Sequence, residues 1–431
     1  MRIINTKDKN FKVEFENILQ RAKSDIKGVS KIVENIIDEI VEDGNEALKR
    51  HIEKFDKWIV KSDDDLLISQ DLMKKAYDNL DENLRASLHK AFDRIKNYHE
   101  KQLPKSWIDF EDNGTILGQK VTPVDRAGLY IPGGKAAYPS SLLMNAIPAL
   151  VAKVKEIVVC TPTPNNEVNE LLLAACYLCK VAKVYKVGGA SAIAAMAYGT
   201  QTISKVDVIT GPGNIFVATA KKMVFGEVNI DMIAGPSEIG IIADESANAK
   251  YVAFDLLSQA EHDEMASSIL ITTSEFLAKN VSLEVQNILK TLSRKEIAQK
   301  SIDDRGSIIV ASNMDEVIEL MNEIAPEHLE VMTKNPFELL PYIKHAGAIF
   351  LGENTPEPIG DYIAGPNHTL PTGSTAKFYS PLNVENFLKK SSIISFSKKA
   401  IDELGEACAL LADTEGLEAH AKSVRVRLED K

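Results

Sequence analysis

The sequence is poor in cysteine and contains no hydrophobic run long enough to cross a membrane. Its four cysteines are Cys160, Cys176, Cys179 and Cys408. They are too few and too irregularly spaced for a disulfide framework, and the CxxC formed by two of them lies within a helical pattern, which indicates buried, reduced thiols. The most apolar stretch, residues 141–154, is interrupted by polar residues and is shorter than the ~20 residues of a spanning helix.

Positive charge is also in deficit. The 431 residues include 50 Lys and Arg against 62 Asp and Glu, a formal net charge of −12. Such a field repels nucleic acid and anionic membrane surfaces, so neither is expected as a partner. The first nine residues do not resemble a secretory signal, so a cytoplasmic location is expected. With 45% hydrophobic residues, the chain is typical of a globular protein of about two or three domains.

Short β-rich runs alternate with helical segments between residues 121 and 244. Four runs each lead into a small-residue turn and then a helix, and they cover residues 128–131, 157–160, 184–187 and 206–210. Repeated strand–turn–helix units predict a parallel sheet with covered faces. Ligands of such sheets bind beyond the carboxyl ends of the strands.

The alternation resumes at residue 239 and ends before a Gly/Pro-rich loop, residues 352–381, which is too long for a simple connection. We therefore predict an α/β fold with two Rossmann-like parallel-sheet domains. Residues 128–236 are assigned to one domain, and residues 26–127 together with 237–382 to the other. The second assignment includes a helix with amphipathic spacing over residues 29–41.

Two extensions flank these domains. Residues 1–25 are expected to form a charged helical arm, and residues 383–431 a polar helical tail. Neither has enough apolar surface to fold alone, and each needs a surface on which to lie. The pair of extensions favours an intertwined dimer.

The helical stretch from Tyr251 to Glu264 carries two side chains that can bind a metal ion. Gln259 and His262 are three residues apart and project to one side of an otherwise apolar helix. A histidine near a helix end is often only hydrogen-bonded or exposed, and glutamine is an uncommon metal ligand. The pair alone therefore does not decide whether a metal site is present.

Two small-residue turns are candidates for ligand binding, although no G-x-G-x-x-G motif is present. Gly211-Pro-Gly213 precedes Asn214 and offers free amides at a helix start, which suits a phosphate or ribose but equally a tight turn. The second turn, residues 234–238, precedes a strand and carries the hydroxyl of Ser237.

The segment Ala325-Pro-Glu-His328 places an acid beside an imidazole. Pro326 suits the first position of a helix, which would put Glu327 and His328 in its first turn. Such a pair suits proton transfer, and a helix cap with incidental charges is the alternative. Spacing alone assigns no role to four further polar residues, Asp361, His368, Glu415 and His420.

Taken together, several stretches resemble the histidinol dehydrogenase family. They are Gly128–Lys135 (GLYIPGGK), Gly211–Asn214 (GPGN), residues 230–238 (IDMIAGPSE) continuing to 255–262 (DLLSQAEH), residues 325–328 (APEH) and residues 360–368 (GDYIAGPNH). The resemblance spans nearly the whole chain. It implies a homodimer with shared active sites that oxidises L-histidinol to L-histidine through L-histidinaldehyde, with two NAD⁺ and one Zn²⁺ per subunit, as the last step of histidine biosynthesis.

The resemblance also assigns roles to residues. The implied zinc ligands are Gln259, His262, Asp361 and His420. The implied substrate contacts are Ser237, Glu415, His328 and the same four ligands. The implied NAD⁺ contacts are Tyr130, Asn214 and Ser191, the last at a position where the family usually has glutamine.

Within the implied site, His328 is expected to take the hydroxyl proton in the first oxidation, and Glu327 to activate water in the second. Because Glu415 and His420 lie in the tail, one subunit's tail is expected to complete the other's site.

Two other functions remain open from the residues. A zinc hydrolase on the same scaffold would use a similar Gln, His and Asp set, and hydrolysis of an ester or amide without NAD⁺ would favour it. A non-catalytic relative would bind histidinol or histidine tightly without turnover. The effect of Ser191 and the role of His368 are left unassigned.

Overall fold

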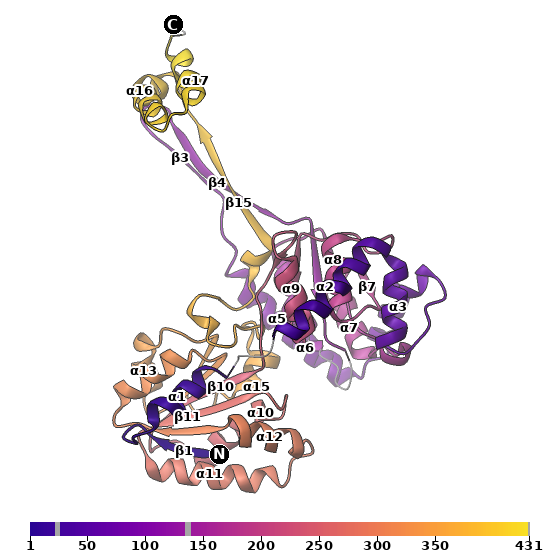
Figure 1. Ribbon diagram of the computed structural model, residues 1–431, viewed down its shortest axis with the longest axis vertical. Coiled ribbons are helices and arrows are strands. Elements are labelled where there is room, and N and C mark those ends of the chain that lie inside the picture. The colour runs from indigo at the N-terminus through magenta and orange to yellow at the C-terminus, as the bar shows by residue number, and fades with distance from the viewer. Residues whose placement is uncertain (22–25, 134–138, 430–431) are drawn as a thin grey trace. The chain divides into compact units, whose positions relative to one another are not determined.

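The computed structural model describes residues 1–21, 26–133 and 139–429 (Figure 1). The chain divides into two compact units. Unit 1 comprises Met1–Gln102 and Asp125–Phe387, and unit 2 comprises Leu103–Val124 and Leu388–Lys431. No helix among the described residues is long and apolar enough to cross a membrane.

Unit 1 contains a first six-stranded sheet, in which only the edge strand β2 is antiparallel to its neighbour. Its strands, in spatial order, are β2 (Leu67–Ile68), β7 (Lys183–Tyr185), β6 (Glu156–Cys160), β5 (Arg126–Tyr130), β8 (Val208–Thr210) and β9 (Asn229–Ile230). The helices between its strands are α6 (Pro139–Val151), α7 (Glu170–Leu178), α8 (Gly189–Tyr198) and α9 (Ile215–Val224). These strands and helices confirm the four predicted strand–turn–helix units. The units could be predicted because strands buried on both faces of a parallel sheet are apolar along their whole length.

A second six-stranded sheet in unit 1 is entirely parallel. Its strands, in spatial order, are β1 (Arg2–Asn5), β12 (Ser307–Val310), β11 (Ser267–Thr272), β10 (Glu238–Ala243), β13 (His328–Met332) and β14 (Ala348–Leu351). The longer helices of this part are α1 (Phe11–Leu19), α10 (Ala249–Ala260), α11 (Glu275–Leu289), α12 (Lys295–Arg305) and α13 (Met314–Ile324). Short helical turns include α14 (Pro336–Leu339), α15 (Glu357–Ile359) and η4 (Gly360–Ala364).

The prediction of a separate helical arm at the N-terminus is wrong for the first residues of the chain. Arg2–Asn5 form β1, which pairs with β12, and α1 buries Phe15 and Ile18 in the core of the second sheet. Arg21 is also buried, and its guanidinium lies 2.8 Å from Glu238 Oε2. A four-residue edge strand has too short a pattern to be separated from a helix by sequence. Residues 22–25 of the predicted arm lie outside the described residues.

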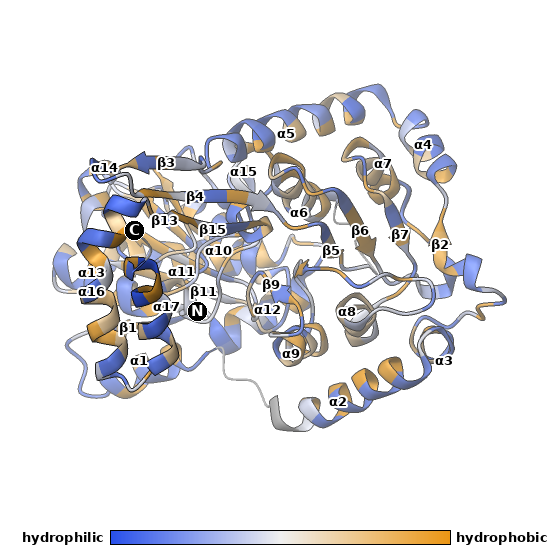
Figure 2. Cartoon of the chain, turned by 90° about the horizontal axis from the view of Figure 1, so that it is seen from above, coloured by the Kyte–Doolittle hydropathy of each residue, from blue (hydrophilic) through white to orange (hydrophobic). Residues whose placement is uncertain are grey.

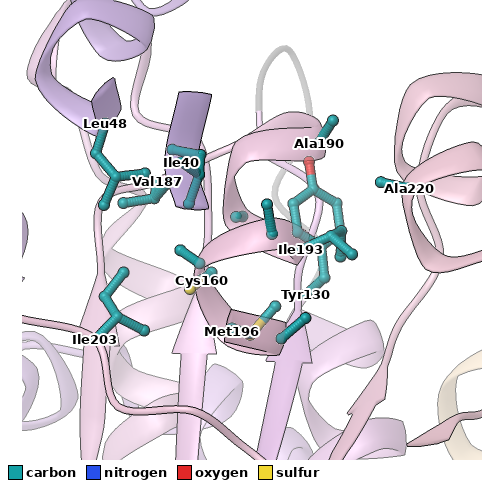
Figure 3. Close-up of a cluster of buried hydrophobic side chains, with 14 of the residues drawn as sticks. Ile40, Leu48, Tyr130, Cys160, Val187, Ala190, Ile193, Met196, Ile203 and Ala220 are labelled. Carbon is teal, nitrogen blue, oxygen red and sulfur yellow. The ribbon is translucent and has the colours of Figure 1, made fainter. Parts of the chain in front are cut away.

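The helices over residues 26–100 pack against the helices that flank the first sheet, whereas the sequence assigned them to the second domain. They are α2 (Ile26–Asp43), α3 (Asn45–Phe55), α4 (Gln70–Asp78) and α5 (Glu82–Glu100). Ile40 and Leu48 share one buried cluster with Ile193 of α8 (Figure 3). The ribbon of α2 alternates between apolar and hydrophilic residues in Figure 2, as its predicted amphipathic spacing requires. That spacing shows that one face is buried but not which sheet covers it.

Unit 2 joins an antiparallel sheet to two helices. Its strands, in spatial order, are β15 (Leu388–Ser395), β4 (Ile116–Pro123) and β3 (Trp107–Phe110), and its helices are α16 (Lys398–Thr414) and α17 (Glu418–Glu429). The tail therefore begins with a strand, where a wholly helical tail was predicted. Leu388–Ser395 (LKKSSIIS) lacks the apolar/polar alternation of a half-buried strand, so its pairing with β4 is not visible in the sequence.

Candidate functional site

Near its C-terminal end, the helix α10 carries a buried side-chain amide, that of Gln259. Gln259 is 1% exposed, and its Oε1 has no hydrogen-bond partner among the described residues. An unsatisfied buried acceptor costs roughly 1–3 kcal/mol, which a bound cation would offset. His262 follows the helix end, and burial lowers its pKa while the nearby Asp361 carboxylate opposes that shift. Of the predicted pair, His262 therefore lies near Asp361 of the long loop.

A histidine and two carboxylates form the centre of the site. One ligand atom each from His328, Glu357 and Asp361 lie within 4.8 Å of one another. His328 Nε2 lies 3.6 Å from Asp361 Oδ1 and 3.8 Å from Glu357 Oε1. Both His328 Nε2 and Glu357 Oε1 are buried without a hydrogen-bond partner in the described part of the chain. Sequence reasoning missed Glu357, although it precedes Asp361 by four residues, the spacing of neighbours on a helical turn.

Glu327 and His328 are adjacent at the start of β13. The segment was predicted to open a helix, and this is wrong: Ala325, with a φ of +47°, ends α13 in the left-handed conformation, and Pro326 follows that end. Glu327 Oε2 accepts the backbone N–H of Glu238 at 2.9 Å and lies 3.7 Å from His328 Nδ1. His328 Nδ1 lies 3.0 Å from the Glu238 carbonyl, to which it donates, so Nε2 is left facing the carboxylates.

The charges in this site are strongly coupled. Burial raises the pKa of Glu327 to about 8, with His328 opposing the shift. Burial alone would lower the pKa of His328, but Glu327, Asp361 and Glu357 outweigh it and raise this pKa to about 10. Burial also raises the pKa of Glu357 to about 8, and Asp361 adds to the shift. The buried acids thus outnumber the imidazole, an imbalance that a cation would relieve.

These donors fit a divalent metal ion. A buried amide oxygen, imidazole nitrogens and carboxylate oxygens are nitrogen and oxygen ligands of the kinds that Zn²⁺ accepts. A cation among them would compete with the proton at His328 and favour the neutral imidazole that a general base requires.

A cavity of about 550 Å³ opens beside the cluster. It is lined by His328 and Asp361, by Tyr98 of α5, and by His368, to which the sequence assigned no role. His368 Nε2 is buried without a partner among the described residues. The volume falls within the range of small-molecule sites.

The three predicted cofactor residues follow the carboxyl ends of strands in the first sheet, where ligands of parallel sheets bind. Tyr130 ends β5, Ser191 lies in the first turn of α8 after β7, and Asn214 caps α9 after β8. The Tyr130 hydroxyl accepts the N–H of Gly189 at 3.2 Å, which links two of these turns. Ser191 is buried, and its Oγ lies 2.8 Å from Nδ1 of His51. None of the contacts among the described residues bears on the predicted role of Ser191 in NAD⁺ binding.

Lys221 and Asp231 form a buried ion pair, and both residues also hydrogen-bond to the turn before Asn214. Lys221 Nζ donates to the Gly211 carbonyl at 2.9 Å, and Asp231 Oδ2 accepts the Gly211 N–H at 2.8 Å. Gly211 has a φ of +120°, and a Cβ there would lie 2.0 Å from the Tyr130 carbonyl oxygen. Only glycine fits this close approach between two candidate cofactor turns.

We expect Gly211→Ala to lower the free energy of unfolding by roughly 3 kcal/mol or more, because backbone strain and a direct clash add together. Gly226→Ala is the matched control, since Gly226 has a φ of +106° but nothing within 4 Å of an added Cβ. Its expected loss is roughly 1 kcal/mol. Urea denaturation measures both losses, and equal values would contradict the inferred clash.

The remaining predicted residues are less enclosed. Ser237 is half-buried just before β10, and its carbonyl accepts the N–H of Ser267 at 3.0 Å. Glu415 caps the C-terminus of α16, and His420 lies in α17; both are exposed and belong to unit 2.

Comparison with known proteins gives one consistent result. The sequence profile of the family described as "Histidinol dehydrogenase" matches residues 19–428. Proteins of that name from Sulfurimonas denitrificans and Wolinella succinogenes are 71% and 67% identical to this chain, covering 98% and 99% of it and 98% of each relative. A crystal structure of histidinol dehydrogenase from Elizabethkingia anophelis superposes with a TM-score of 0.93 at 35% identity, covering 100% of this chain and 98% of that one.

Proposed function

Because this chain belongs to the histidinol dehydrogenase family, we propose that its site oxidises L-histidinol to L-histidine through L-histidinaldehyde, with two NAD⁺ and one Zn²⁺ per subunit. Membership makes it an NAD-dependent oxidoreductase of histidine biosynthesis. The observation that carries the finer proposal is the cluster of His328, Glu357 and Asp361 beside a cavity of about 550 Å³, in which His328 Nε2 is buried without a hydrogen-bond partner among the described residues.

The proposed zinc ligands are Gln259, His262, Asp361 and His420. The buried amide of Gln259 and the proximity of His262 to Asp361 support the first three. When bound, Zn²⁺ fixes the nitrogens of the substrate and NAD⁺ accepts hydride. The proposed cofactor contacts are Tyr130, Ser191 and Asn214, and the proposed substrate contacts add Ser237, His328 and Glu415 to the zinc ligands.

The two proton-transfer residues are proposed to divide the reaction. The hydrogen bond from His328 Nδ1 to the Glu238 carbonyl leaves Nε2 as the base that takes the hydroxyl proton of histidinol. Glu327 then takes a proton from the water that adds to the aldehyde, and its raised pKa of about 8 suits proton exchange near neutral pH. Burial of both groups shields the aldehyde from side reactions between the steps.

We further propose a homodimer in which the tail of one subunit supplies Glu415 and His420 to the other. Unit 2 exposes large apolar side chains, among them Trp107 at 51%, Phe110 at 72% and Ile394 at 70%. Apolar surface gathered on one small unit is typical of a protein interface. The exposure of Glu415 and His420 leaves both available to a partner.

The direct test is the yield of NADH from a limiting amount of L-histidinol. We expect two NADH per histidinol, because both oxidations occur in one site. A chelator should abolish turnover, and added Zn²⁺ should restore it. One NADH per histidinol would indicate a simple alcohol dehydrogenase, and none from metal-replete protein would end the proposal.

A further inference from the structure

A buried arginine near the N-terminus joins two elements that flank the proton-transfer residues. Arg21 follows α1, and its Nη2 donates to Glu238 Oε2 at 2.8 Å and to the Ile324 carbonyl at 2.9 Å. Glu238 is the first residue of β10, and Ile324 is the last residue of α13. The side chains of Arg21 and Glu238 are both buried. One guanidinium group therefore connects the start of β10 to the end of α13.

Glu238 contacts both proton-transfer residues through its backbone. Its N–H donates to Glu327 Oε2 at 2.9 Å, and its carbonyl accepts from His328 Nδ1 at 3.0 Å. The backbone of this one residue thus orients the carboxyl group of Glu327 and the ring of His328. A displacement of the Glu238 backbone would move both groups at once.

The long Gly/Pro-rich loop binds the same two partners of Arg21. Gly373 N–H donates to Glu238 Oε1 at 3.0 Å, and Ser374 Oγ donates to the Ile324 carbonyl at 2.7 Å. Two residues separate Ile324 from Glu327 along the chain. The contacts of Arg21 therefore join the N-terminal segment, the loop and the two elements that hold Glu327 and its neighbour.

Stability alone does not account for this buried ion pair. Moving two charges out of water costs free energy that their attraction often fails to recover, and neutral residues of similar volume are often as stable. A guanidinium adds fixed geometry, because its donors lie in one rigid plane.

We infer that Arg21 is a positioning residue, which acts through Glu238 to hold Glu327 and His328 in the geometry that proton transfer requires. The inference rests on the proposed function of these two residues. Because Glu238 contacts both of them, the loss of Arg21 should slow both oxidations, whereas the loss of either proton-transfer residue should slow mainly one.

Arg21→Met removes the guanidinium and keeps an apolar side chain. We expect kcat per bound zinc to fall roughly 10–100-fold with L-histidinol and with L-histidinaldehyde, because small displacements of reacting groups have effects of this size. The KM values of L-histidinol and NAD⁺ should stay close to those of the unaltered protein, since the described hydrogen bonds of Arg21 reach none of the proposed ligand contacts.

Two single variants calibrate this result. Arg21→Lys can still form an ion pair with Glu238 and should recover part of the lost kcat. Arg2→Met is the matched control, because Arg2 belongs to the same N-terminal segment but forms an exposed ion pair with Glu14, at 2.8 Å. Exposed pairs contribute little, so its kcat and Tm should be unchanged.

The double variant Arg21→Met/Glu238→Gln separates positioning from stability. The amide keeps an acceptor for Gly373 N–H, and no buried charge is left without its partner. Its Tm should therefore lie closer to that of the unaltered protein than the Tm of Arg21→Met does. Its kcat per bound zinc should remain low, because the connection to Ile324 is still missing.

The variants are compared as zinc-loaded full-length protein, by NADH formation in each half reaction and by thermal unfolding. The inference is overturned if Arg21→Met keeps its kcat per bound zinc, or if the double variant recovers kcat together with Tm. The double variant also decides the matter if Arg21→Met alone does not fold. Unaltered protein that forms no NADH from L-histidinol would end the proposed function and the inference with it.

Discussion

Replacing Glu327 with Gln is expected to slow the oxidation of L-histidinaldehyde by roughly 10²–10⁴-fold while largely sparing the oxidation of L-histidinol. The amide cannot take a proton from the attacking water. It can still accept the backbone N–H of Glu238, so the geometry around His328 should be retained. His328→Ala should have the opposite selectivity and depress the first oxidation.

The two half reactions are followed separately, by NADH formation from L-histidinol and from L-histidinaldehyde. Thermal unfolding of both variants serves as the control, because both residues are buried beside β10. A similar loss in both half reactions for either variant would contradict the proposed division between Glu327 and His328.

Mixed dimers of His262→Ala and His420→Ala subunits are expected to regain activity that neither variant has alone. If the tail of one subunit completes the site of the other, a mixed dimer contains one intact site and one that lacks both histidines. Random association makes half of the dimers mixed, so about one quarter of the wild-type activity should return in the unseparated mixture, and about half in isolated mixed dimers.

The two variants are co-expressed with different affinity tags, and the doubly tagged dimer is isolated before assay. Co-expression of two differently tagged His262→Ala chains is the matched control and should stay inactive. Mixed dimers without activity would show that each subunit uses its own tail.

The parallel sheets were predictable because their strands are buried on both faces. Such strands are continuous apolar runs, and Ile157–Cys160 or Ile239–Ile242 cannot be confused with solvent-exposed segments. Short edge strands such as Arg2–Asn5 carry no such pattern and depend on a partner far along the chain. Pro326 was misread because proline follows the end of a helix as readily as it begins one.

The site was only partly visible in the sequence. Gln259 and His262 were singled out by their spacing, but a pair three residues apart is weak evidence, and the family motifs added the remaining roles. Glu357 could have been found from its four-residue spacing to Asp361.

The pairing of β1 with β12 has a consequence for handling the protein. Arg2–Asn5 form the edge strand of the second sheet and pair with β12, whose four residues are all buried. Trimming the first few residues would bare a row of backbone amides and carbonyls that can recruit a strand from another molecule. Preparations shortened at this end should therefore precipitate or self-associate more readily, even though every residue proposed for catalysis is still present.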